Sequence, residues 1–493
     1  MRYQTLTPEE AASLIEHGEC IGLSGFTPAG ALKAVPRAIA ARARAEHAAG
    51  RPFRLKVMTG ASTSDAVDGL LTEAEAVELR MPYQSCPLTR REINRCAIAY
   101  NDMHLSFMVR AMRNGHIPRV RTAIIEVCNV TDDGELTLTT SAGNTPAFCA
   151  LADRIILELN TYHRPELRDI HDIYISRELP GRDLIPIIHE DSRIGSGTLK
   201  VDPNKIVGIV PTHEPDHIAP FKPGNAATDQ IGRNVIHFLE QEYTEGRIPE
   251  GFLPIQSGVG NIANAVLSAL GDSAIIPPIR MYGEVIQEAV IRLMQQGRCT
   301  FASGCSLVVP DAVLEDIYAH FDFYRDKILL RPAEISNNTA VIRRLGVISM
   351  NTAIEADLFG NINSTHIQGN MIMNGIGGSG DFARCAVLTI FTCPSIAKGG
   401  NISAIVPMVS HTDHTEHDVD VIVTEQGIAD LRGKSPRERA ELVIENCAHP
   451  DYKPLLRRYL ALTPIGHTPH CLSKAFAFHI AYQQHGDMRL ADL

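Results

Sequence analysis

Several features common in other protein classes are missing from this chain of 493 residues. It has no tryptophan, no Lys- or Arg-rich block, and no run approaching the roughly 18 apolar residues that a membrane-spanning helix needs. Its formal net charge is −11, and residues 1–19 are too polar for a secretory signal peptide. We therefore expect a cytoplasmic protein that binds neither membranes nor nucleic acid.

Paired cysteines are also missing. The eleven cysteines are scattered singly, without a CxxC motif, and their number is odd. This usage is typical of reduced thiols in a reducing compartment rather than of a disulfide framework. We interpret them as small side chains, most of them buried.

What the chain does contain is the composition of a globular protein, 44% hydrophobic and 21% charged. Because one hydrophobic core stops growing at roughly 250–300 residues, we expect two or three domains. Strand-like runs such as 122–127 and 154–160 alternate with helical patterns, which predicts parallel sheets built from βαβ units. Three prolines at 213–225 indicate a linker, and we predict domains at 1–222 and 223–493.

The two halves open in a similar way. Residues 20–40 and 254–270 both lead from a short apolar run through a Ser-Gly turn into a helical pattern. Ser24 and Ser257 occupy matching places, and without a G-x-S-x-G elbow we interpret both as turn residues rather than nucleophiles. The similarity predicts two related open α/β domains with mostly parallel sheets and an active-site cleft between them.

A dense glycine cluster at 375–380, GIGGSG, fits a literal GxGxxG. Only seven residues separate Gly380 from the strand-like run at Leu388, too few for a crossover helix, and no acidic residue follows about 20 residues on to hold a ribose. A nicotinamide site is therefore not expected. The N–H groups of such a loop would suit an oxyanion or a phosphate, and a tight turn between two strands is an equally open alternative.

Three histidines, His411, His414 and His417, have an HxxHxxH spacing that could bind a metal if the segment were helical. Acidic residues such as Asp413 and Glu416 are interleaved with them. We favour carboxylate-paired histidines in a polar turn and predict no metal site.

Longer segments carry more information than these spacings. They resemble the acetyl-CoA hydrolase/transferase family, the class I CoA-transferases, in the family's order and over nearly the whole chain. In length and in the GDSAIIPPI spacer at 271–279, the chain is most similar to the propionyl-CoA:succinate CoA-transferase branch. The matching segments include SGFTPAGALKAVP at 24–36, LPIQSGVGNIANAVL at 253–267, MYGEVIQEAV at 281–290, ILLRPAEISNN at 328–338, MNGIGGSGDFAR at 373–384, SIAKGGNISAIVPMVSH at 395–411 and VTEQGIADLRGKSPRERA at 423–440.

The resemblance implies roles for particular residues. The family's catalytic glutamate falls on Glu284, and Gly283 stands where a small hydroxyl residue is usual. Two backbone donors of an oxyanion hole fall on Val259 and Gly378. The residues expected at the substrate or the coenzyme are Asn337, Gly377, Lys398, Glu425, Gly258 and Gly260.

The resemblance also implies a reaction, in which coenzyme A moves from a short-chain acyl-CoA to a mono- or dicarboxylate through an acyl-glutamyl anhydride and a glutamyl-CoA thioester. Propionyl-CoA and succinate are the expected pair. Coenzyme A would be a substrate, no cofactor would be bound permanently, and the enzyme would be a homodimer. Succinyl-CoA:acetate transfer, acetyl-CoA hydrolysis and a non-catalytic acyl-CoA-binding regulator stay open. On pattern alone, Glu284 would be a surface carboxylate in a helical run, EVIQEAVIRLM.

Overall fold

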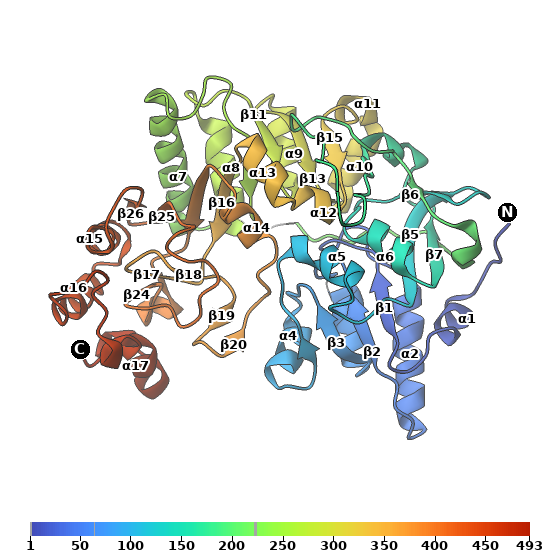
Figure 1. The fold of residues 1–493 in the computed structure, drawn as a ribbon, viewed down its shortest axis with the longest axis horizontal. Helices are drawn as coiled ribbons and strands as arrows, with labels where there is room; N and C mark the ends of the chain where they lie inside the picture. Colours follow the sequence, from blue (N-terminus) through green and yellow to red (C-terminus); the bar gives the residue numbers. More distant parts are fainter. Residues whose placement is uncertain (1, 64, 221–223) are drawn as a thin grey trace.

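The computed structural model describes residues 2–63, 65–220 and 224–493. Two large sheets form its framework, and helices surround both of them (Figure 1). The first sheet contains β1 (Cys20–Leu23), β2 (Leu55–Met58), β3 (Val77–Met81), β4 (Ala99–Tyr100), β5 (Thr122–Val130), β6 (Glu135–Leu138), β7 (Arg154–Asn160), β8 (Leu199–Lys200) and β9 (Ile206–Thr212). The second contains β10 (Ile255–Ser257), β11 (Ile279–Tyr282), β13 (Cys299–Gly304), β15 (Ile328–Leu330), β16 (Ile348–Thr352), β21 (Leu388–Thr392), β25 (Val421–Thr424) and β26 (Gly427–Asp430).

The two sheets share one strand order. In the first, β1 is flanked by β2, β3 and β4 on one side and by β5, β7 and β9 on the other. In the second, β10 is flanked by β11, β13 and β15 and by β16, β21 and β25 in the same way. All of these neighbours run parallel. The prediction of two related open α/β domains with mostly parallel sheets is confirmed.

Local sequence explains why these elements form. Ile155, Ile156 and Leu157 of β7 are fully buried, and such a continuous apolar run is what a parallel strand covered on both faces requires. The helix α7 (Ala226–Thr244) is capped by the preceding Asn225, whose side chain accepts from two backbone N–H groups of the first turn. It buries one face at a helical spacing that includes Ile231.

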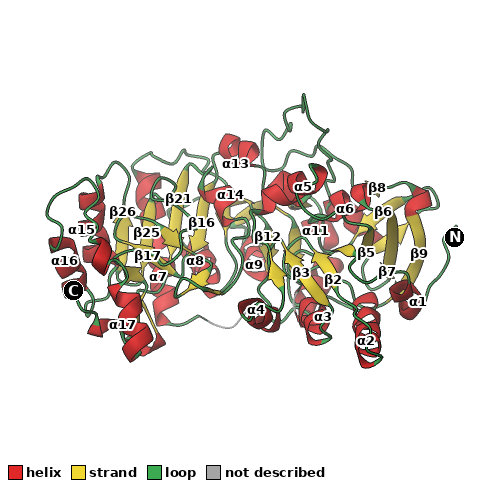
Figure 2. Ribbon diagram, turned by 60° about the horizontal axis from the view of Figure 1, so that its bottom comes forward, coloured by secondary structure: helices red, strands yellow, loops and turns green. Residues whose placement is uncertain are grey.

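The other helices connect the strands or close the chain. In Figure 2, helices flank the two sheets. They are α1 (Pro8–Ser13), α2 (Val35–Ala48), α3 (Leu70–Glu73), α4 (Pro87–Asn94), α5 (Leu105–Arg113), α6 (Thr145–Leu151), α8 (Asn261–Asp272), α9 (Glu288–Gln295), α10 (Asp311–Ala319), α11 (Phe321–Tyr324), α12 (Ala333–Ser336), α13 (Thr339–Leu345), α14 (Ser379–Ala383), α15 (Pro436–Cys447), α16 (Lys453–Ala461) and α17 (Ala477–His485).

The second domain also contains short strands outside its large sheet, and one pair of them contacts the first domain. The hairpin of β19 and β20 lies beside α4 (Figure 1), where Asn94 exchanges two hydrogen bonds with the backbone of Ile372. These strands are β12 (Val285–Gln287), β14 (Ser306–Val308), β17 (Glu355–Asp357), β18 (Ile362–Asn363), β19 (His366–Ile367), β20 (Met371–Ile372), β22 (Ile396–Ala397), β23 (Ile402–Ser403) and β24 (Ile405–Val406).

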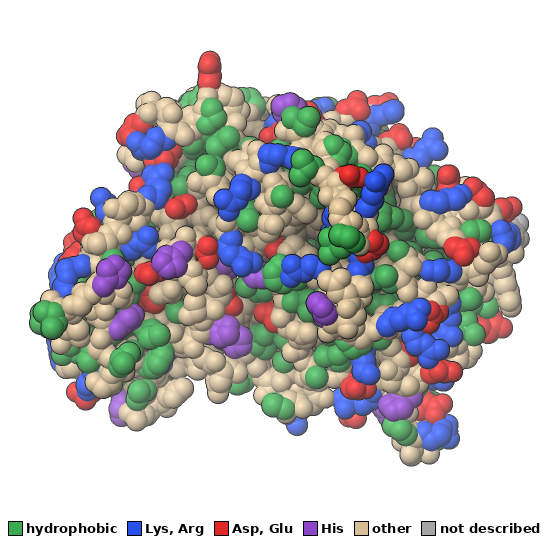
Figure 3. All heavy atoms as spheres, in the orientation of Figure 1, with side chains coloured by type: hydrophobic (Ala, Val, Ile, Leu, Met, Phe, Trp, Pro, Cys, Tyr) green, Lys and Arg blue, Asp and Glu red, His purple; other side chains and the backbone are tan. Residues whose placement is uncertain are grey.

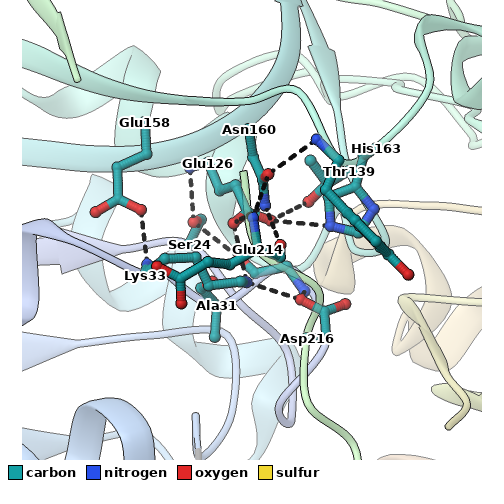
Figure 4. A network of polar contacts seen from close by, with 12 residues as sticks. Ser24, Ala31, Lys33, Glu126, Thr139, Glu158, Asn160, His163, Glu214 and Asp216 are labelled. Atoms are coloured by element: carbon teal, nitrogen blue, oxygen red, sulfur yellow. Dashed lines mark hydrogen bonds and ion pairs between the residues drawn. The ribbon is translucent and has the colours of Figure 1, made fainter. Parts of the chain in front are cut away.

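The linker expected at 213–225 has no helix or strand between 213 and 220, and the boundary predicted at 222 lies outside the described residues. A buried ion cluster ties this linker to the first domain (Figure 4). Lys33 Nζ lies 2.9 Å from a carboxylate oxygen of Glu126 and 2.9 Å from one of the linker residue Asp216. Within the described chain, Glu126, Asp216 and His163 are the one group with metal-ligand geometry, and Lys33 supplies the positive charge there.

Among the described residues, no helix combines the length and apolar character that crossing a bilayer requires. On the face drawn in Figure 3, acidic and basic side chains are interspersed.

Candidate active site

The carboxyl ends of the central strands of both sheets meet at one cavity of about 510 Å³. From the second domain, the loops after β10, β11 and β16 contribute lining residues, among them Glu284. From the first domain, the segments after β1, β2 and β3 contribute Phe26, Thr27, Ala61 and Tyr83. Open α/β sheets bind ligands at this edge, where the strand order reverses. The expected cleft between the domains is therefore present.

Glu284 lies in the turn between β11 and β12, not in a helix, so the helical pattern was misleading for 284–287. Its carbonyl oxygen accepts from the backbone N–H groups of Cys305 (2.6 Å) and Ser306 (3.2 Å). Because β12 pairs in parallel with β14, strand pairing prevails over the local helical periodicity, and α9 begins only at Glu288.

The Glu284 carboxylate faces the cavity and is held by Asn337, whose side-chain amide donates to it at 2.8 Å. Burial raises the pKa of Glu284 to about 7, the hydrogen bond from Asn337 opposes this rise, and the nearby Asp381 adds to it. Both protonation states are therefore populated near neutral pH. The ionised form is a poorly solvated carboxylate in an apolar-walled cavity.

Gly378 approaches this carboxylate closely. A Cβ atom at position 378 would overlap the carboxylate of Glu284 and the amide of Asn337. No residue with a side chain fits there without displacing them, which gives a physical reason for this glycine. The cluster at 375–380 leads into the five-residue helix α14, which is too short for the crossover of a dinucleotide fold.

The first domain holds this glycine loop. The backbone N–H of Ile376 donates to both carboxylate oxygens of Asp102 at 3.0 Å, and the N–H of Leu105 donates to the carbonyl of Gly377 at 3.2 Å. Tyr100 donates its hydroxyl to Asp102, and burial raises the pKa of Asp102 to about 7. Residues of the first domain thus fix a loop of the second domain at the cavity.

Val259 also lines the cavity, in the loop between β10 and α8. Its neighbours Gly258 and Gly260 also line the cavity, and Gly260 has a φ of 109°. The side-chain amide of Gln287 donates to the carbonyl of Gly258 at 3.0 Å, which anchors the loop to β12. Gly377 lines the cavity as well, so the structure brings together most of the residues expected from the sequence.

Lys398 and Glu425 are not brought into this cavity. Lys398 is exposed, and Glu425 follows β25 and accepts from the backbone and hydroxyl of Ser395. Glu425 lies at the same carboxyl edge as Glu284, but β25 is separated from β16 by β21. Their expected contacts with coenzyme and substrate stay predictions.

The sequence did not point to Tyr83 in the cavity or to Asp381 behind it. Tyr83 lines the cavity beside Gly377, and burial raises the pKa of its hydroxyl to about 12. Asp381 lies behind the site, within hydrogen-bond distance of Asn337. Asp381 belongs to the matching segment MNGIGGSGDFAR, which could have identified it, whereas no pattern around Tyr83 distinguishes it.

The three spaced histidines have separate partners. His411 lies 3.3 Å from a carboxylate oxygen of Asp413, and His417 lies 3.9 Å from Glu416, so the carboxylate pairing is confirmed for these two. His414 differs, because it is buried and its Nε2 lies 3.2 Å from the hydroxyl of Ser379 at the cavity. In the described part of the chain, the three imidazoles do not form a group with metal-ligand geometry.

Comparisons with known proteins agree with this arrangement. Residues 2–211 match the acetyl-CoA hydrolase/transferase N-terminal domain, and residues 314–460 match the C-terminal domain of the same family. A propanoyl-CoA:succinate CoA transferase of Escherichia coli (strain K12) is 47% identical, over 97% of this chain and 97% of that protein. A succinyl-CoA:acetate CoA-transferase of Clostridium kluyveri is 45% identical, over 99% of this chain and 91% of that protein. An acetyl-CoA hydrolase of Candida glabrata is 39% identical, over 98% and 95% respectively.

A solved structure supports the fold alone. The crystal structure of RipA from Yersinia pestis is 22% identical, covers 92% of this chain and 96% of its own, and superposes with a TM-score of 0.69. The sequence relatives are CoA-transferases and acetyl-CoA hydrolases, so this chain is an enzyme of that kind. It belongs to the acetyl-CoA hydrolase/transferase family.

Proposed function

We propose that the enzyme transfers coenzyme A between a short-chain acyl-CoA and a carboxylate, with propionyl-CoA and succinate as its pair, through covalent intermediates on Glu284. One observation carries the proposal. The Glu284 carboxylate faces a cavity between the domains and is held against the amide of Asn337, at a point where only glycine fits at position 378.

In the proposed reaction, coenzyme A moves onto Glu284 in two attacks. A carboxylate oxygen of Glu284 attacks the thioester carbonyl, the carbon–sulfur bond breaks, and an acyl-glutamyl anhydride and a thiolate result. The thiolate attacks the glutamyl carbonyl, which releases the first acid and leaves coenzyme A on Glu284 as a thioester. The second carboxylate then reverses these steps. No bond to water is made, so the free energy of the thioester is retained.

Each attack passes through an oxyanion. In our proposal, the backbone N–H groups of Val259 and Gly378, which both line the cavity, stabilise it. Such donors are fixed by the backbone, and removing one typically costs about 3 kcal/mol of transition-state stabilisation. The hydrogen bonds from the Ile376 N–H to Asp102 support this role, because they restrict the loop that carries Gly378.

The same cavity also has to exclude water, because a hydrolysed anhydride makes the enzyme a hydrolase. Acetyl-CoA hydrolysis is therefore the second candidate, favoured by the likeness to the Candida glabrata protein. Purified enzyme incubated with propionyl-CoA, with and without succinate, separates the candidates. Turnover of propionyl-CoA only when succinate is present, with succinyl-CoA as the product, supports transfer. Release of free coenzyme A without an acceptor supports hydrolysis. No turnover in either would support a non-catalytic acyl-CoA-binding protein and contradict both.

Trapping tests the covalent intermediates. Borohydride reduces a glutamyl thioester to an alcohol, and peptide mass spectrometry should locate that change at Glu284. Glu284→Ala should abolish both the adduct and turnover while it leaves coenzyme binding intact. Glu288→Gln, which alters a nearby carboxylate outside the cavity lining, is the matched control and should retain both.

The assembly and location are part of the proposal. We propose a cytoplasmic homodimer that binds acyl-CoA and short-chain mono- or dicarboxylates as substrates and carries no permanent cofactor. All eleven cysteines are unpaired thiols, which supports a reducing compartment. Light scattering of the eluted protein measures the oligomeric state, and a mass of one chain would contradict the dimer.

A further inference from the structure

Asn337 lies between two carboxylates. Its side-chain nitrogen lies 2.8 Å from Oε1 of Glu284 and 3.3 Å from Oδ2 of Asp381, so one amide nitrogen donates to both. Asn337 and Asp381 are fully buried. Their contacts are therefore not exchanged for contacts with bulk water.

The surroundings of Asn337 decide which side of its amide carries the nitrogen. A carboxylate only accepts hydrogen bonds, so Asp381 selects the NH₂ group. On the other side, the thiol of Cys305 donates to the amide oxygen with a sulfur–oxygen distance of 3.8 Å. If the amide turned over, its oxygen would face both carboxylates and its nitrogen would lose its acceptors. Asp381 thus keeps a donor aimed at Glu284.

Asp381 is itself fixed from the first domain. The backbone N–H and the hydroxyl of Ser106 donate to its two oxygens at 3.0 and 2.5 Å. Ser106 lies in the first turn of α5, and Asp381 lies in α14, directly after the loop that carries Gly378. A hydrogen-bonded path therefore runs from α5 of the first domain through Asp381 and Asn337 to Glu284.

We infer that Asp381 is a positioning residue of the reaction, which is fixed by Ser106 of α5 and acts through Asn337 to orient the Glu284 carboxylate. The inference rests on the function proposed for Glu284. Asp381 makes no contact with the cavity itself, so its effect is indirect. Its charge also opposes ionisation of Glu284, because like charges disfavour a second charge nearby.

Other titratable groups face this pair. Burial lowers the pKa of His104 to about 4, so this histidine beside Gly380 is neutral at working pH. The remaining groups are Arg384 beside Asp381, and Tyr83 and Cys305 beside Glu284. Replacing Asp381 removes one of the charges that raise the pKa of the Cys305 thiol, yet this thiol and the Tyr83 hydroxyl stay protonated near neutral pH. A change in the pH profile there is therefore attributable to the loss of the Asp381 charge.

Two variants, Asp381→Asn and Asp381→Ser, remove the charge and keep a polar group, so that one remains informative if the other does not fold. We expect kcat to fall by roughly 10- to 100-fold through misplacement of Glu284. We also expect the acid limb of kcat/KM for propionyl-CoA to move to lower pH by about half a unit or more. Asp322→Asn is the control. Its side chain is 96% exposed and outside this hydrogen-bonded path, so its acid limb should stay at the parental pH.

A double-mutant cycle tests the path through Asn337. In the Asn337→Ala background, Asp381→Asn should change kcat less than twofold, because the relayed contact is already absent. An acid limb at the parental pH in both Asp381 variants, or full additivity in the cycle, would overturn the inference. If the parent enzyme formed no adduct on Glu284, the proposed function itself would be rejected. Failure of the inference on Asp381 and failure of the proposed function are therefore distinguishable.

Discussion

Ile376 donates its backbone N–H to both carboxylate oxygens of Asp102 at 3.0 Å, and this contact joins the glycine loop of the second domain to the first domain. Asp102→Ala removes the acceptor. We expect kcat to fall by roughly 10- to 100-fold because the loop that carries Gly378 loses its fixed position. Hydrogen exchange should show faster exchange of the amides at 375–379. Asp322→Ala, at a side chain that is 96% exposed, is the control, and equal exchange in both variants would contradict this role.

Gly378→Ala should be nearly inactive while it remains folded. The added methyl group would overlap the carboxylate of Glu284 and the amide of Asn337, so one of them has to move. We expect kcat to fall by about 100- to 1000-fold, the range found when an oxyanion donor is lost. Gly251→Ala is the matched control, since a Cβ there meets open space. Parental kcat in Gly378→Ala would show that the close approach is unimportant.

Gly283→Ser restores the hydroxyl residue usual beside the family's glutamate. A Cβ at position 283 would lie 3.6 Å from its nearest neighbour, the side chain of Gln256, which is ordinary contact. We therefore expect a folded enzyme with kcat/KM within about threefold of the parent, because only well-packed sites resist an added group. A large loss of activity or of thermal stability would show that the glycine is required.

The Glu284 carboxylate should destabilise the fold at alkaline pH. Burial raises its pKa to about 7 from an ordinary 4.5, so the folded protein favours the protonated form. That stabilisation is fully present below about pH 4.5 and is lost as the pH rises through 7, with a loss of roughly 3 kcal/mol. Glu284→Gln keeps the shape without the charge. Its Tm should exceed the parental Tm at pH 8, and most of the difference should vanish at pH 5.

The control for this measurement is Gly251→Ala, which changes no titratable group, so its difference in Tm from the parent should not depend on pH. A lower Tm for Glu284→Gln at pH 8 would mean that the ionised carboxylate is stabilised in the fold. The pKa of Glu284 would then lie below its ordinary value, and the acid limb of activity would move with it.

The strands were predictable because buried parallel strands are continuous apolar runs, as at 154–160. The matching turns at Ser24 and Ser257 also predicted two related domains, and the two sheets do share one strand order. The environment of Glu284 was not predictable from local pattern. Its hydrogen-bond donor Asn337 is 53 positions away, and Asp381 lies 44 positions beyond that, so only the fold brings them together. The helical spacing after Glu284 misled because it carries no information on the pairing of β12 with β14.

Lys33→Met should destabilise the first domain strongly. The side chains of Glu126 and Asp216 are at most 1% exposed, and Lys33 is the cation between them (Figure 4). Removing one partner of a buried ion pair typically costs about 3–5 kcal/mol, since the remaining charge is left without compensation. Urea unfolding should therefore show a lower free energy of unfolding. Lys200→Met, which breaks an exposed pair with Asp133, should change it by less than about 1 kcal/mol.

The double variant Lys33→Met/Glu126→Gln should recover part of this loss, because one of the two uncompensated charges is gone. Asp216 also accepts from the backbone N–H of Gly30 at 3.1 Å, in the loop that brings Phe26 to the cavity. Activity should therefore fall with stability in the single variant and recover with it in the double variant. If the double variant recovers stability but not activity, Lys33 affects the cavity by something other than the charge balance of this cluster.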